Sequence, residues 1–153
     1  MNVANNLLIP EIGRLIQEGH TVTILVKGFS MRPFLEHGDK VVLGRCLNVF
    51  INDVVLAKIE SGQYVLHRVI RKEDNHLTLQ GDGNLTNTEQ CLTSGVVAKA
   101  IAFIRKGRKS EDGTNELKWK FYSFIWLHLK FIHRFFLVFY CHIWLKFIER
   151  NKY

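Results

Sequence analysis

The segment DVVLAKIESGQYVLHRVI, residues 53–70, decides the fold class because it contains two short strands and the turn between them. Apolar and β-branched residues alternate on both sides of its Ser-Gly pair, which is typical of a tight hairpin turn. In the second half, YVLHRVI, this alternation places Val65, His67 and Val69 on one face of the strand. The segment therefore predicts a β-hairpin with a histidine on an apolar face.

Further elements are predicted on both sides of this hairpin. The other predicted strands are TVTILV (21–26), KVVL (40–43), HLTLQ (76–80) and GVVAKAIAFI (95–104). Before the first of them, residues 5–18 carry apolar side chains at helical spacing, and Gly19 is a suitable helix end. We therefore predict a mainly β fold, a compact antiparallel β domain over residues 1–104 with one N-terminal helix.

Upstream of the hairpin, a serine lies in the segment KGFSMRPFLEHGDKVVL, residues 27–43. An activated serine needs a base that takes its proton and a third group that orients the base. His67 is a candidate base, because an imidazole on an apolar face is biased towards its neutral form. Asp82, in LQGDGN at the end of the next strand, is a candidate third group. The alternative is purely structural, with Ser30 and Asp82 in turns and the histidine in the core.

Four segments in this order, GFSMRPFLEHGDKVVL, INDVVLAK, YVLHRVI and LQGDGN, resemble the motif set of the clan that joins type I signal peptidases and LexA-like self-cleaving repressors. The resemblance covers about residues 21–104 and implies that Ser30 is the nucleophile of a serine endopeptidase. Bacterial signal peptidases and the repressors have a lysine base where this chain has His67. The archaeal and endoplasmic-reticulum branch has a histidine there, so the resemblance implies His67 as general base and Asp82 as its orienting carboxylate.

The chain departs from the family pattern at two places. In the eukaryotic branch a further aspartate follows the Gly-Asp box, at a position where this chain has Thr88 with Glu89 beside it. Either Glu89 replaces that aspartate, or Asp82 alone orients the histidine. Signal peptidases also often carry a hydroxyl residue two positions before the nucleophile, where this chain has Gly28. Backbone N–H groups, including that of the serine, are therefore expected to bind the oxyanion.

The resemblance also implies that Gly28, Met31 and Pro33 flank the substrate cleft, although by composition Met31 and Pro33 fit a core equally well. No phosphate-binding loop, dinucleotide fingerprint or zinc pattern is present, so we expect no cofactor and no metal. The three cysteines are widely spaced and predict reduced thiols in the cytoplasm rather than a disulfide framework. The N-terminal segment offers no signal peptide or anchor.

Charge divides the chain into two parts. Residues 1–104 carry 10 Lys and Arg and 10 Asp and Glu, whereas residues 105–153 carry 11 and 4. The whole net charge of +7 therefore lies in the last third. Within it, residues 105–116 predict a charged linker, and residues 117–153 predict a basic, aromatic, amphipathic helical tail.

The predicted tail has the composition of a helix that lies on a membrane surface. Its longest stretch without Lys, Arg, Asp or Glu is 11 residues, whereas a span needs about 20. We therefore predict peripheral binding to an anionic membrane from the cytoplasmic side and disfavour a transmembrane tail. The alternative is a helix that packs on the β domain. Nucleic acid is not expected as a partner, because no base-reading module surrounds the tail.

These features together predict a serine endopeptidase, signal-peptidase-like, that cleaves an extended peptide or leader segment of a protein substrate. A non-catalytic, membrane-associated adaptor with the same fold is the alternative from another class. A LexA-like self-cleaving regulator is disfavoured, because only about 20 residues precede the first predicted strand, too few for a helix-turn-helix module.

Overall fold

The computed structural model describes residues 3–84, 86–108, 110–114, 117, 119 and 121. Its elements are, in chain order, α1 (Val3–Gln17), β1 (Val22–Leu25), β2 (Lys40–Gly44), β3 (Val54–Lys58), β4 (Tyr64–Glu73), β5 (His76–Gln80), β6 (Glu89–Leu92), the 3-10 turn η1 (Thr93–Gly95), β7 (Val96–Ile104) and β8 (Glu111–Gly113). The predicted mainly β fold with one N-terminal helix is confirmed.

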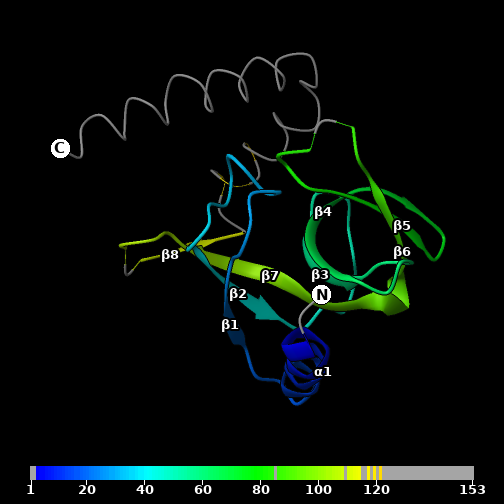
Figure 1. Ribbon diagram of the computed structural model, residues 1–153, viewed down its shortest axis with the longest axis horizontal. Helices are drawn as coiled ribbons and strands as arrows, with labels where there is room; N and C mark the ends of the chain where they lie inside the picture. Colours follow the sequence, from blue (N-terminus) through cyan, green and yellow to red (C-terminus); the bar gives the residue numbers. More distant parts are fainter. Residues whose placement is uncertain are drawn as a thin grey trace.

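The strands form one antiparallel sheet in the order β1-β2-β7-β3-β4-β5-β6, with β8 beside β7. β3 and β4 are the predicted hairpin, in which Val55 lies opposite His67 and Gly62 adopts the left-handed conformation at the turn, with φ of 81°. The sheet curls strongly between β3 and β6 (Figure 1). The curl brings β6 back to the hairpin, where the Glu60 N–H donates to the Gln90 carbonyl at 3.0 Å.

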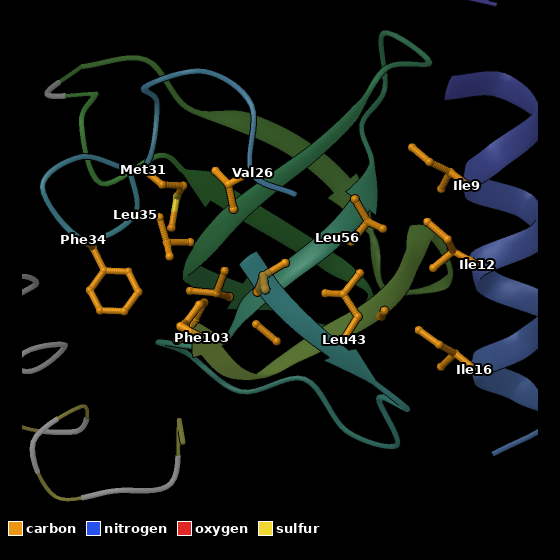
Figure 2. Close-up of a cluster of buried hydrophobic side chains, with 14 residues drawn as sticks. Ile9, Ile12, Ile16, Val26, Met31, Phe34, Leu35, Leu43, Leu56 and Phe103 are labelled. Atoms are coloured by element: carbon orange, nitrogen blue, oxygen red, sulfur yellow. The ribbon is translucent and has the colours of Figure 1, made fainter. Parts of the chain in front are cut away.

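Two apolar clusters lie on opposite faces of β3, because alternate residues of a strand point to opposite sides. Val54 and Leu56 belong to the first cluster, and Val55 and Ala57 belong to the second. In the first cluster the isoleucines of α1 point towards the strands, and the side chains of residues 31, 34 and 35 enter from the other end (Figure 2). The core therefore holds the turn that follows Ser30.

The sequence pattern predicts neither β6 nor β8. β8 lies within the predicted linker and pairs with β7, with Ile104 opposite Glu111. Next to it, Arg105 Nη1 lies 3.0 Å from the carboxylate of Asp39. Strand pairing therefore continues past residue 104.

The predicted tail lies outside the described residues, except for positions 117, 119 and 121, which are helical. Across the part of the chain that the structure describes, no helix combines the length and the apolarity needed to cross a membrane.

Candidate active site

Ser30 and His67 come together in space although 37 positions separate them. Ser30 is exposed in the loop between β1 and β2, whereas His67 is buried in β4. The Ser30 Oγ lies 3.1 Å from His67 Nε2, and His67 Nδ1 lies 2.9 Å from the Oε2 atom of Glu89. The three side chains thus form a continuous line of hydrogen bonds from hydroxyl to imidazole to carboxylate.

Glu89 determines which imidazole nitrogen carries the proton. A carboxylate can only accept, so the His67 Nδ1–H donates to Glu89 and the neutral ring keeps a lone pair on Nε2. The Ser30 hydroxyl can then donate to Nε2, at the distance that proton transfer requires. This is the arrangement of nucleophile, general base and orienting group found in serine hydrolases on unrelated folds.

Asp82 does not occupy the orienting position that we predict from the sequence. Its two carboxylate oxygens accept hydrogen bonds from Arg68 Nε at 2.7 Å and Nη2 at 2.6 Å. Both side chains are buried, with 1% of Arg68 and 2% of Asp82 exposed. Among the two candidate carboxylates, the structure places Glu89 on His67 and Asp82 on the neighbouring arginine.

Strand register explains why Asp82 contacts Arg68 and Glu89 contacts His67. Arg68 follows His67 in β4, so the two side chains point to opposite faces. Arg68 pairs with Gln80, the last residue of β5, and the chain therefore leaves the sheet beside Arg68 and brings Asp82 to it. Glu89 opens β6 opposite Leu79, on the strand next to β5, and reaches the histidine from there. Because the sequence pattern does not predict β6, it cannot place Glu89 beside His67.

Gly81 and Gly83 let the segment after β5 lie close against the loop that carries Ser30. The Gly83 N–H donates to the Ser30 carbonyl at 2.7 Å. A Cβ on Gly81 would lie 2.4 Å from that carbonyl oxygen and 3.1 Å from His67 Nε2, and a Cβ on Gly83 would lie 2.9 Å from the Phe29 carbonyl oxygen. Real Cβ atoms do not approach backbone this closely. The two glycines of GDG therefore allow the backbone of this segment to lie close to the backbone of the Ser30 loop.

A cleft of about 210 Å³ begins at Ser30. Its walls are the end of β1 with the following loop (24–28), the residues Ser30 and Met31, and the start of β4 (64–66). Gly28 and Met31 line this cleft, and Met31, only 2% exposed, also belongs to the first apolar cluster. Pro33 is half-buried and is not among the residues that line this cleft.

Within the described residues, no hydrogen-bond acceptor occupies the Ser30 N–H. This backbone donor is therefore available to an oxyanion formed next to the serine.

Two comparisons with known proteins bear on the site. A family model described as Peptidase S24-like matches residues 4–101, from α1 into β7, and the match spans Ser30, His67 and Glu89. Among curated proteins, none matches the chain.

Proposed function

The chain belongs to the Peptidase S24-like family, and on this premise we propose that it is a serine endopeptidase acting through Ser30, His67 and Glu89. The family implies the fold of a serine protease or of a self-cleaving regulator. The observation that carries the proposal is the pair of distances at the histidine, 3.1 Å to Ser30 Oγ and 2.9 Å to the Glu89 carboxylate. A serine with a general base beside it, and a third group that orients this base, meets the requirements of acyl transfer.

The proposed reaction has two halves. Ser30 Oγ attacks the peptide carbonyl carbon while His67 Nε2 takes the hydroxyl proton, and the Glu89 carboxylate stabilises the imidazolium. The Ser30 N–H donates to the oxyanion. His67 then gives the proton to the leaving amine, which breaks the peptide bond and leaves an acyl-enzyme. A water molecule, deprotonated by the same histidine, hydrolyses the ester and frees Ser30.

The substrate proposed for this site is an extended peptide added as a strand. β1 pairs with β2 along one edge. Residues Tyr64 to His67 of β4 pair with β3, and pairing with β5 begins only at Arg68. In the described part of the chain, β1 and the start of β4 therefore each have one edge without a partner strand, and both line the cleft at Ser30. A peptide between them would gain main-chain hydrogen bonds while its carbonyl lies beside the serine.

His67 favours the histidine-based branch of the clan over the lysine-based one. A signal-peptidase-like role in the removal of leader segments follows from that resemblance as the finer proposal. The basic, aromatic composition of residues 117–153 supports a location at an anionic membrane surface.

The test uses the purified full-length chain and a diverse peptide library, with cleavage products identified by mass spectrometry. We expect cleavage by the wild type and a fall of at least about 10³-fold in Ser30→Ala and in His67→Ala, because the two groups act as a unit. Ser61→Ala, which changes an exposed turn serine, is the matched control and should stay active. Peptide binding with no cleavage would contradict the enzyme and favour a non-catalytic adaptor.

A further inference from the structure

Trp119 packs on the domain from a position beyond residue 101, where the family match ends. Its ring centroid lies 3.8 Å from that of Phe34 and 4.7 Å from that of Phe103, and both phenylalanines belong to the first apolar cluster. The guanidinium carbon of Arg68 lies 5.0 Å from the Trp119 ring centroid, within the range of a cation–π contact. One aromatic side chain of the C-terminal segment thus covers a buried arginine.

The arginine under Trp119 is connected to the nucleophile by a short series of contacts. Arg68 donates two hydrogen bonds to Asp82, and the next residue, Gly83, donates its N–H to the Ser30 carbonyl at 2.7 Å. Arg68 Nη1 also donates to the Asn52 carbonyl at 3.1 Å, which fixes the guanidinium on a second side. From indole to serine carbonyl, each step is a direct contact.

Burial makes this series depend on Trp119. An ion pair that is almost fully buried is strong only while water is excluded from it. The rings of Trp119 and Phe34 both lie over the guanidinium, at 5.0 Å and 5.8 Å from its carbon, so removal of the indole takes away the nearer of these two rings and weakens the hold of Arg68 on Asp82. Residues 81–83 would then hold the loop that carries Ser30 less rigidly in position.

We propose that Trp119 is a positioning residue for Ser30, which ties the start of the C-terminal segment to the active-site loop through Arg68 and Asp82. Its effect on catalysis rests on the proposed peptidase function, whereas its effect on the loop does not. Leu117 and Phe121, two positions away on either side, are 85% and 67% exposed and provide matched controls on the same segment.

The experiment compares full-length wild type with Trp119→Ala, Trp119→Phe, Leu117→Ala and Phe121→Ala. Amide hydrogen exchange is measured at Gly83, whose N–H bonds to Ser30, and on the core strands β2 and β7. In Trp119→Ala we expect exchange at Gly83 to accelerate by about tenfold or more through local opening, with β2 and β7 unchanged within about twofold. Trp119→Phe keeps an aromatic ring on Arg68 and should stay near wild type, as should both controls.

The kinetic readout uses a peptide that the wild type cleaves. A displaced nucleophile lowers the rate of the chemical step, so Trp119→Ala should lower kcat by about tenfold or more with KM within about twofold. Unchanged exchange at Gly83, or equal acceleration at Gly83, β2 and β7, would overturn the proposal and make Trp119 an ordinary core residue. If the wild type cleaves no peptide, the proposed function fails, and exchange at Gly83 still decides whether Trp119 holds the loop.

Discussion

The proton on His67 must lie on Nδ1 if Ser30 is to be activated, and the carboxylate of Glu89 is the group that keeps it there. The 2.9 Å contact between Nδ1 and Glu89 Oε2 fixes the ring orientation as well as the tautomer. Arg68, the next residue in the strand, has its own carboxylate in Asp82. Two adjacent residues of β4 are thus held by two different acids, His67 by Glu89 and Arg68 by Asp82.

Glu89→Gln should therefore lose activity while the fold stays intact. The amide that replaces the carboxylate can donate to Nδ1, which favours the wrong tautomer and leaves Nε2 protonated. We expect kcat/KM to fall by at least about a hundredfold. Because the Glu89 side chain is 24% exposed, the free energy of unfolding in urea should change by less than about 1 kcal/mol. Activity near that of the wild type would remove Glu89 from the site.

Asp82→Asn should show the opposite pattern. The substitution removes the charge of Asp82 from its buried ion pair with Arg68, and the loss of one partner of such a pair costs about 3–5 kcal/mol. We expect a lower urea midpoint as the main effect, with a further loss of activity of about tenfold in the protein that stays folded, because Asp82 also holds the segment that bonds to the Ser30 carbonyl. A fully stable Asp82→Asn protein with a hundredfold lower rate, beside an active Glu89→Gln protein, would restore Asp82 as the orienting group.

Residue patterns make Ser30 and His67 candidates because the serine lies in a distinctive segment and strand alternation places the histidine, and the structure places the two side chains 3.1 Å apart. These patterns do not decide between Asp82 and Glu89, because that choice depends on register. Asp82 goes to Arg68 only because Gln80 lies opposite Arg68. The sequence does not predict the contact of Trp119 with Arg68 either, because 51 positions separate the two residues and no local pattern links them.

Strands of this domain differ in how strongly their own sequences specify them. β2, β3, β4 and β7 are rich in β-branched and apolar residues and are predicted directly. β6, EQCL, buries only Cys91, and β8, EDG, has no apolar side chain. Each pairs with a neighbouring strand, β6 with β5 and β8 with β7. Tertiary pairing, and not local propensity, determines these two, which is why composition suggests a linker where β8 lies.

Residues 81–83, which follow β5, form a strap against the loop of Ser30, and Gly81 and Gly83 let its backbone approach that loop closely. Gly81→Ala would place a Cβ 2.4 Å from the Ser30 carbonyl oxygen, so one of the two backbones must move. We expect a loss of stability of about 1–3 kcal/mol, typical of overpacking, together with reduced activity.

A suitable control is Gly44→Ala, since its added Cβ would meet only side-chain atoms of Ile101, the nearest at 3.1 Å. Side-chain atoms can shift, so this variant should stay within about 1 kcal/mol of the wild type and keep its activity. Thermal unfolding and kcat/KM on one peptide measure both effects. If Gly81→Ala matched Gly44→Ala in both, the close approach of the strap would have no bearing on the site.

Over the whole chain, charge and folded structure are distributed differently. Strands β1 to β7 and the site lie in residues 1–104, which have equal numbers of acidic and basic residues, whereas the excess of +7 lies in residues 105–153. Trp119 joins the two parts, because it belongs to the basic segment and packs on Phe34 and Phe103 of the core. A surface that attracts the basic segment would thus hold the domain close by.

We predict that the full-length chain binds anionic vesicles through this basic segment. Each basic residue near an anionic surface contributes about 1 kcal/mol, so Lys130→Gln combined with Arg134→Gln should weaken binding by roughly 2 kcal/mol, about thirtyfold. Lys58→Gln combined with Arg71→Gln removes the same charge from exposed positions of the β domain and should have little effect. Vesicle flotation measures both. Binding should also weaken at high salt, because the Debye length is already only about 8 Å at physiological ionic strength. Equal weakening by both double variants would assign the attraction to overall charge, and a full-length chain that ignores anionic vesicles would contradict membrane binding by the basic segment.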